Sequence, residues 1–335
     1  MVDDLHRQIL TLDSHIDIPW PNTPDPFAPS QRRVDVLKMV RGGLGAGCFA
    51  AYVPQGPRTP EGWDAARERA LAMLDAINAM GRTAAGLTAR VATTVADIAA
   101  AKRDGVTAIV PAVENGHSIG EDLGVLGQFR AKGARYMTLT HNGHNALADS
   151  SNPRTDLGDA ATLHGGLSSL GRAAVAEMNR LGMMVDVSHV SKAAMLQAAA
   201  VSRTPVVATH SCVHALCPAP RNLDDEQLDA LRDTGGVIQI TAVAGFLRPQ
   251  GKPEQVSVAD YVDHIDYAVK RCGIGHVGIS SDFDGGGAVA GWADASQSAN
   301  MTAELVRRGY DAAAVAALWG GNFLRVMAQA EAAAA

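Results

Sequence analysis

His15 and Asp17 stand two positions apart in an apolar segment, residues 10–20, whose composition predicts a β-strand. In an extended strand, side chains at this spacing project from the same face, so this imidazole and this carboxylate can converge on one point. Both are side chains that bind divalent metals in proteins. Pro19 ends the strand, because proline has no amide hydrogen to donate to a central ladder. The pair therefore predicts a metal site at the carboxyl end of a strand.

Side chains able to bind a metal or carry a proton follow five further apolar segments. These residues are Glu114, His141, His189, His210 and Asp282. Imidazole and carboxylate without thiolate favour zinc, ahead of manganese, cobalt or iron. The set suffices for two ions if Glu114 bridges them, with the first-strand pair on one ion and His189 and His210 on the other. Two such ions lower the pKa of a shared water to about 7, so the pattern predicts hydrolysis.

Eight short apolar segments alternate with amphipathic stretches, and these elements must position the residues above. The predicted strands are residues 10–20, 46–53, 107–113, 136–139, 184–187, 206–209, 237–241 and 277–280. The predicted helices are residues 60–80, 94–103, 123–132, 167–181, 191–201, 224–233, 257–272, 303–308 and 311–330. Apolar strands separated by helices predict an α/β fold with a parallel sheet, and eight units predict a closed (β/α)8 barrel of the TIM type.

The chain shows no linker that would divide it, so residues 1–335 are expected to form one domain. In a barrel of this type the loops after the strands' carboxyl ends build the site, which is where the polar residues stand. Residues 21–30 include four prolines and predict an irregular loop at the same end, a candidate lid.

Composition limits the kinds of partner. With 335 residues and 47% hydrophobic side chains, the chain can bury a large core. A formal net charge of −6 provides no basic field for nucleic acid or an anionic membrane. Neither a secretory signal nor a membrane span is visible, so a cytoplasmic enzyme with a small-molecule substrate is expected. The four cysteines lack CxxC spacing, which predicts buried reduced thiols.

Several motifs in order resemble those of the membrane (renal) dipeptidase family, in its soluble bacterial branch. The similar spacing runs from about residue 10 to residue 327, and the motifs lie at residues 13–20, 113–119, 139–142, 186–191, 210–211, 220–222 and 281–285. The resemblance implies a (β/α)8 metallopeptidase related to the amidohydrolases, with two zinc ions per chain and dipeptides as substrates. It assigns His15 and Asp17 to the first ion, Glu114 to the bridge, and His189 and His210 to the second ion.

The resemblance also implies roles for residues that bind substrate or move protons. His141 would contact the scissile carbonyl oxygen and stabilise the tetrahedral intermediate. Arg221 would hold the C-terminal carboxylate of the dipeptide, with Asn222 beside it. Asp282 would move the proton from the bridging water to the leaving amine. Composition alone leaves Asp284 as an equal candidate for the proton carrier, and only the resemblance favours Asp282.

Other interpretations stay open at this point. A related barrel hydrolase of cyclic amides, β-lactams or lactones commonly has His-x-His on the first strand and a carboxylated lysine as the bridge. A metal-dependent nuclease is disfavoured by the net charge, and a metal-binding receptor without turnover predicts a broken ligand set. His117, His144 and His214 are expected either to orient ligands or to face solvent. The resemblance further implies a homodimer and substrates of the form L-Xaa-L-Xaa or L-Xaa-D-Xaa.

Overall fold

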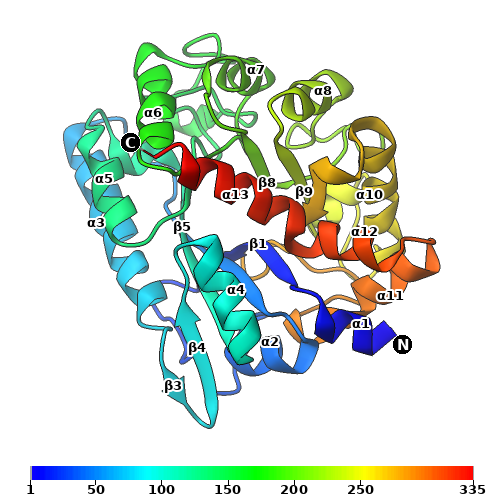
Figure 1. Ribbon diagram of the computed structural model, residues 1–335. Helices are drawn as coiled ribbons and strands as arrows, with labels where there is room; N and C mark the ends of the chain where they lie inside the picture. Colours follow the sequence, from blue (N-terminus) through cyan, green and yellow to red (C-terminus); the bar gives the residue numbers. More distant parts are fainter. Residues whose placement is uncertain (1, 335) are drawn as a thin grey trace.

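Eight parallel strands form a ring in the computed structural model, which describes residues 2–334 (Figure 1). Around the ring they are β1 (Leu12–Asp17), β2 (Ala46–Tyr52), β5 (Thr107–Glu114), β6 (Tyr136–Thr138), β7 (Met184–Asp186), β8 (Val207–Ser211), β9 (Val237–Ile240) and β10 (Val277–Ile279). Each corresponds to one predicted strand. Residues 1 and 335 of the predicted domain 1–335 lie outside the described part.

The ring closes between β10 and β1. Ile16 and Phe283 form an isolated parallel bridge, and the Asp17 amide donates to the Phe283 carbonyl at 2.9 Å. In return the Asp282 amide donates to the His15 carbonyl at 3.0 Å. The predicted (β/α)8 barrel is therefore confirmed, and the loop after β10 is joined directly to the strand that carries the first predicted metal ligands.

Strand β5 shows how sequence alternation places a ligand inside the barrel. Ala108, Val110 and Ala112 project from one face of the strand and pack in the smaller of two apolar clusters. Glu114 continues that face by the period of two residues. Ile109 projects from the opposite face and packs in the larger core shared with the surrounding helices. Alternation thus carries Glu114 to the top of the barrel interior.

The covering helices match the predicted ones closely. They are α3 (Pro60–Asn78), α4 (Val95–Asp104), α5 (Gly124–Ala131), α6 (Ser169–Arg180), α7 (Lys192–Val201), α8 (Asp225–Asp233), α10 (Val258–Cys272), α11 (Ala299–Arg307), α12 (Ala312–Ala316) and α13 (Asn322–Ala332). Capping boxes begin three of them, at Thr94, Asp224 and Ser257. Side-chain oxygens there accept otherwise unpaired amide hydrogens, which explains why these starts were predictable.

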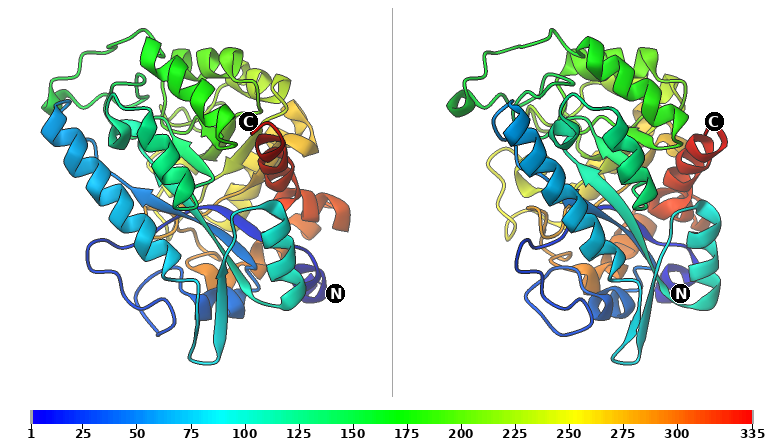
Figure 2. Two further views of the ribbon diagram at one scale, coloured as in Figure 1. Left: turned by 60° about the vertical axis from the view of Figure 1, so that its left-hand side comes forward. Right: turned by 90° about the vertical axis from the view of Figure 1, so that its left-hand side faces the viewer.

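Helix α13 closes the end of the barrel where the strands begin. Phe323 and Met327 pack with Leu12 and Ala46, which start β1 and β2. In the right-hand view of Figure 2, α13 lies on the right, while the loops that follow the strands lie on the left. The loop at residues 21–30 is irregular as predicted and lies among them. The open end of the barrel is therefore the end that carries the polar strand termini.

Several elements were absent from the sequence prediction. They are α1 (Val2–Gln8), α2 (Val36–Gly42), α9 (Ala244–Leu247) and the hairpin β3 (Thr83–Ala84) with β4 (Leu87–Val91). The helices are too short to show a clear helical period. The predicted helix 311–330 is interrupted by a π-helical segment, Ala317–Gly321, where Gly320 packs against Leu10 and Leu12 of the first strand segment.

The model also bears on two expectations from composition. Cys48, Cys212, Cys217 and Cys272 are buried and free, as predicted. Within residues 2–334 no helix has both the length and the apolar composition needed to cross a membrane.

Candidate functional site

Glu114 is the centre of the predicted ligand set. Its Oε2 lies 3.5 Å from Nε2 of His15, whereas its Oε1 lies 3.0 Å from Nε2 of His189 and 3.3 Å from Nε2 of His210. The carboxylate is buried, with 3% of its side chain exposed. Its two oxygens therefore face different imidazoles, as a carboxylate that bridges two ions must.

The remaining predicted ligands join the same cluster. The ligand atoms of His15, Asp17 and Asp282 lie within 4.8 Å of one another, as do those of His15, Glu114 and His210 and those of Glu114, His141 and His189. Nε2 of His189 lies 2.9 Å from Nε2 of His210. Seven side chains from six strands thus meet at one mouth. Only His15 and Asp17, which share a strand, are close to each other in sequence.

His15 is oriented by a tyrosine that the sequence analysis did not single out. Its Nδ1 lies 2.9 Å from the Tyr136 hydroxyl, which donates its own hydrogen to the Ser14 carbonyl at 3.0 Å. The hydroxyl can then only accept from Nδ1, so in the neutral imidazole, the form that binds a metal, Nε2 carries the lone pair. Nε2 of His15 and Oδ1 of Asp17 are buried without a hydrogen-bond partner among the described residues. Two buried atoms with free lone pairs, on side chains whose ligand atoms lie within 4.8 Å of one another, fit a metal ion.

His210 is oriented in the same way from another strand. Its Nδ1 lies 2.9 Å from Oγ1 of Thr209, and that hydroxyl donates to Oδ2 of Asp186 at 2.7 Å. The lone pair of His210 is therefore on Nε2, which faces Glu114. Asp186 also accepts from the Thr138 hydroxyl at 2.6 Å. Asp186 belongs to the motif at residues 186–191 that also contains His189. That motif was the only hint in the sequence that Asp186 helps to orient a ligand.

The charge of the site follows from burial and from crowding of carboxylates. Burial acts to lower the pKa of His15, but Glu114 and Asp17 outweigh it and raise that pKa to about 10. Burial lowers the pKa of His210 to about 3, so this imidazole is neutral at pH 7. Burial raises the pKa of Asp282 to about 7. The carboxylates of the cluster thus favour a positive charge beside them, which a metal ion would supply. The imidazole of His210 stays neutral and available as a ligand.

Backbone conformation at the mouth is unusual at four residues. Asn115, His189, Asp282 and Asp284 have φ angles of 87°, 68°, 58° and 64°. Non-glycine residues rarely adopt positive φ, and where they do the surrounding contacts hold them there. All four directly follow or lie close after barrel strands, so sharp turns are built into the mouth.

Gly285 lies against the carboxylates of this cluster. A Cβ atom there would lie 1.9 Å from Oδ2 of Asp17 and 2.5 Å from Oδ1 of Asp282. Any side chain would displace one or both acids, so glycine is required for steric reasons.

We therefore expect Gly285→Ala to weaken metal binding at least tenfold, by analogy with the loss of other groups that hold ligands in place. Competition with a chromophoric chelator would measure the affinity. Gly127→Ala on α5 is the control, because its Cβ would meet no atom within 4 Å. Equal affinities for the two variants and the parent protein would contradict this steric role.

A cavity of about 600 Å³ opens over the cluster. It is lined by residues of the mouth: Asp17, Ile18, Pro19, Trp20, Tyr52, Arg69, Glu114, His141, Asn142, Asn152, His189, His210, Arg221, Val243, Phe246, Asp282, Asp284, Gly285 and Gly286. A small molecule placed there would therefore contact the candidate ligands and an arginine that is 4% exposed, Arg221.

Comparison with known proteins identifies the family to which this barrel and its site belong. The sequence matches the family described as membrane dipeptidase, peptidase family M19, over residues 1–335. The chain belongs to the membrane dipeptidase family. The resemblance that its motifs indicated is thereby confirmed.

Two curated relatives show how far the similarity extends. Dipeptidase verJ of Clonostachys rogersoniana is 34% identical over 335 residues, covering 96% of this chain and 84% of that protein. Dipeptidase aclJ of Aspergillus oryzae is 40% identical over 220 residues, covering 65% of this chain and 50% of its own length. The chain thus spans about half the length of aclJ.

Solved structures of the family agree with the barrel described above. The probable dipeptidase PvdM from Pseudomonas aeruginosa superposes with a TM-score of 0.91 at 32% identity, covering 99% of this chain and 98% of that one. A metallo peptidase from Rhodobacter sphaeroides, liganded with a phosphinate mimic of the dipeptide L-Ala-D-Ala, superposes with a TM-score of 0.81 at 26% identity, covering 96% and 99%.

In this member of the dipeptidase family, the two acids that composition left equivalent have different surroundings. Oδ1 of Asp284 accepts from the Arg33 amide at 2.7 Å, and its Oδ2 accepts from the Val34 amide at 3.3 Å. Asp284 thus fastens the irregular loop after β1. Asp282 instead lies with His15 and Asp17.

Arg221 and Asn222 are adjacent in sequence, but their side chains have different surroundings. Arg221 lines the cavity, where its Nη2 donates to the His210 carbonyl at 3.0 Å and its Nε has no partner among the described residues. Asn222 does not line this cavity. Its amide group donates to the carbonyls of Cys217 and Phe246, both at 2.8 Å. Asn222 therefore holds two loops together behind Arg221, and its predicted contact with substrate stays a prediction.

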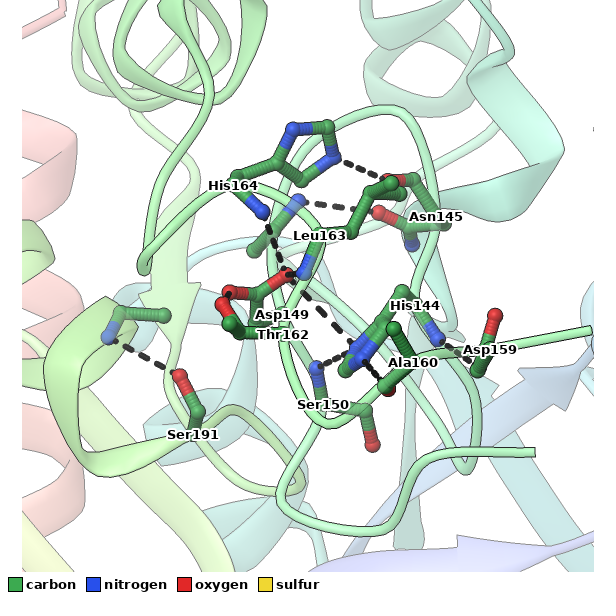
Figure 3. A network of polar contacts seen from close by, with 12 residues as sticks. His144, Asn145, Asp149, Ser150, Asp159, Ala160, Thr162, Leu163, His164 and Ser191 are labelled. Carbon is green, nitrogen blue, oxygen red and sulfur yellow. Dashed lines mark hydrogen bonds and ion pairs between the residues drawn. The ribbon is translucent and has the colours of Figure 1, made fainter. Parts of the chain in front are cut away.

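His144 is buried in a network of polar contacts that also includes Ser150 (Figure 3). Its Nδ1 accepts from the Ser150 amide at 3.0 Å, and its Nε2 lies 3.0 Å from the Ala160 carbonyl. The Ser150 hydroxyl then contacts the carbonyls of His141 and His189, at 2.6 and 3.2 Å. His144 thus helps to orient the site through Ser150, one of the two alternatives predicted for it.

The other two histidines with open roles differ from His144. His117 is buried and its Nδ1 lies 3.1 Å from Nε2 of Gln55. Burial lowers its pKa to about 4, and nearby Arg58 adds to the effect. His214 is exposed, as the second alternative predicted. Neither lines the cavity.

Proposed function

We propose that this protein is a dipeptidase that uses two zinc ions, bridged by Glu114, to hydrolyse unblocked dipeptides. The observation that carries the proposal is the division of Glu114 between His15 on one side and His189 and His210 on the other, inside a cavity that also holds Arg221. The phosphinate mimic of L-Ala-D-Ala on the Rhodobacter sphaeroides relative supports a substrate with D configuration at the second residue, and L-Xaa-L-Xaa dipeptides are proposed from the family resemblance.

The unpartnered Nε2 of His15 and Oδ1 of Asp17 would hold one ion, and His189 and His210 the other. Bound there, zinc supplies a Lewis acid and lowers the pKa of water to about 7. A glutamate in the bridging place and His-x-Asp on the first strand favour a dipeptidase over barrel hydrolases of cyclic amides, β-lactams or lactones.

Asp282 is placed to move the proton. It lines the cavity beside His15 and Asp17, and burial raises its pKa to about 7. A carboxyl group with a pKa near the working pH can both take a proton from water and give it to a leaving amine. His141 lines the same cavity, 4.0 Å from Glu114 and in contact with the Tyr52 ring, where it can donate to the scissile carbonyl oxygen as charge develops.

Arg221 is placed to bind the substrate's C-terminal carboxylate. We expect Arg221→Ala to raise KM for dipeptides by roughly 10- to 100-fold, since a charge-assisted hydrogen bond contributes about 1.5–3 kcal/mol. Initial rates over a range of dipeptide concentrations would measure it. The matched substrate control is the dipeptide amide, which lacks the carboxylate and should respond little to the substitution. An unchanged KM for the free dipeptide would assign the arginine another role.

The function is tested by reconstitution. Protein stripped with a chelator and reloaded with zinc should bind close to two equivalents per chain and release both amino acids from Ala-Ala or Ala-D-Ala. One equivalent or fewer at full activity would remove the two-ion mechanism. If no amino acid is released from any unblocked dipeptide, the proposed dipeptidase activity is wrong. The homodimer implied by the resemblance and the cytoplasmic location expected from the sequence both stay predictions. Light scattering would test the first, and localisation of tagged protein the second.

A further inference from the structure

Arg69 faces the catalytic cavity from the side opposite Arg221. It belongs to α3, the helix that follows β2, whereas Arg221 lies in the loop after β8. In the ring of eight strands β2 is second and β8 is sixth, so the two lie half a turn apart. Both arginines line the cavity. A substrate held at one side by Arg221 therefore extends toward Arg69.

Arg69 is held in a defined position. Its Nε donates to the Tyr52 carbonyl at 3.1 Å, and its guanidinium carbon lies 6.0 Å from the centre of the Tyr52 ring. That ring in turn contacts His141, with ring centres 4.7 Å apart. The guanidinium group is thus fixed against Tyr52, the residue whose ring contacts His141, and this reduces the entropy lost when the guanidinium binds a ligand.

The charge of Arg69 is not neutralised by the protein. Among residues 2–334 no carboxylate lies within ion-pair distance of it, and only its Nε makes a hydrogen bond. Three arginines close to the mouth or on the same helix are paired, in contrast to Arg69 and Arg221: Arg58 with Asp159, Arg154 with Asp156, and Arg67 with Asp64. An unpaired arginine on a cavity wall presents its two terminal nitrogens to an anion, and a carboxylate matches that fork.

We propose that Arg69 binds the side-chain carboxylate of the substrate's first residue, so that the enzyme prefers dipeptides that begin with aspartate or glutamate. The inference rests on the proposed function, because it uses Arg221 as the site of the C-terminal carboxylate. With that end held at the loop after β8 and the peptide bond over the ligand cluster, the first residue is the part of the dipeptide on the α3 side. Its side chain is then the group that reaches Arg69.

The test compares substrates that differ only in charge. For the zinc-loaded wild-type enzyme, kcat/KM for Glu-Ala should exceed that for Gln-Ala by roughly tenfold, the value of one charge-assisted hydrogen bond at the lower end of its range. Arg69→Met should remove this preference by raising KM for Glu-Ala far more than KM for Gln-Ala or Ala-Ala. Arg69→Glu should reverse it, so that Lys-Ala becomes better than Glu-Ala.

Arg67→Met is the matched control, since Arg67 lies on the same helix but pairs with Asp64 and does not line the cavity. It should keep the wild-type preference. If the wild-type enzyme hydrolyses Ala-Ala but shows equal kcat/KM for Glu-Ala and Gln-Ala, the proposed specificity is wrong and the proposed dipeptidase activity is supported. An equal loss for all dipeptides in Arg69→Met would also overturn it, because Arg69 would then bind a group common to every substrate. Failure to hydrolyse Ala-Ala would remove both proposals.

Discussion

Asp282→Asn is expected to lower kcat by roughly 10²- to 10⁴-fold, the usual contribution of a group that transfers a proton in the transition state. Asparagine has nearly the same shape but cannot take a proton from water or return it to the leaving amine. The acid is partly buried in the cavity wall, and its pKa is raised to about 7, first by desolvation and further by Glu114. Steady-state kinetics on a dipeptide, together with metal analysis of the same sample, would measure the effect.

Asp284→Asn is the internal control for this result. Its carboxylate already accepts hydrogen bonds from the amides of Arg33 and Val34, so its loss should loosen a loop and cost far less than the loss of Asp282. Both variants should retain two zinc equivalents. If Asp284→Asn is the more damaging of the two at full metal content, their roles must be exchanged.

Glu114→Gln is expected to lower metal occupancy and activity together, by more than roughly 100-fold in affinity, since even groups that only support ligands contribute 10- to 100-fold. The carboxylate supplies the negative charge that three surrounding imidazoles share, and its two oxygens face different ones. A neutral amide offers one oxygen and, beside the other imidazoles, an NH2 group that repels a cation. Metal content after dialysis against a weak chelator would report the change.

Glu121→Gln is the control for this substitution. It makes the same chemical change at a residue that is exposed on the surface, away from the site. The variant should keep both metals and its full rate. Two tightly held zinc equivalents in Glu114→Gln would show that Glu114 does not bridge, and the two-ion interpretation would then fail at its central residue.

Much of the candidate site was predictable because it depends on local rules. Strand alternation carries Glu114 to the interior face of β5, and the carboxyl ends of parallel strands meet at one end of a barrel whatever their spacing in the chain. His15 and Asp17 follow from the same alternation in β1. Capping residues such as Thr94 mark helix starts by hydrogen bonds that span three positions. The motifs then identified the family without any knowledge of contacts.

The sequence by itself therefore determined the barrel, the end at which the site lies and the chemical types of its ligands. Only the tertiary structure separated Asp284 from Asp282, because the partner amide of Asp284 belongs to Arg33, 251 positions away. It likewise placed Tyr136 under His15 and left Arg69 unpaired across from Arg221. Periodicity reports which face a side chain occupies, but hydrogen bonds and ion pairs between distant segments depend on how the loops fold over the mouth, and no local pattern encodes them.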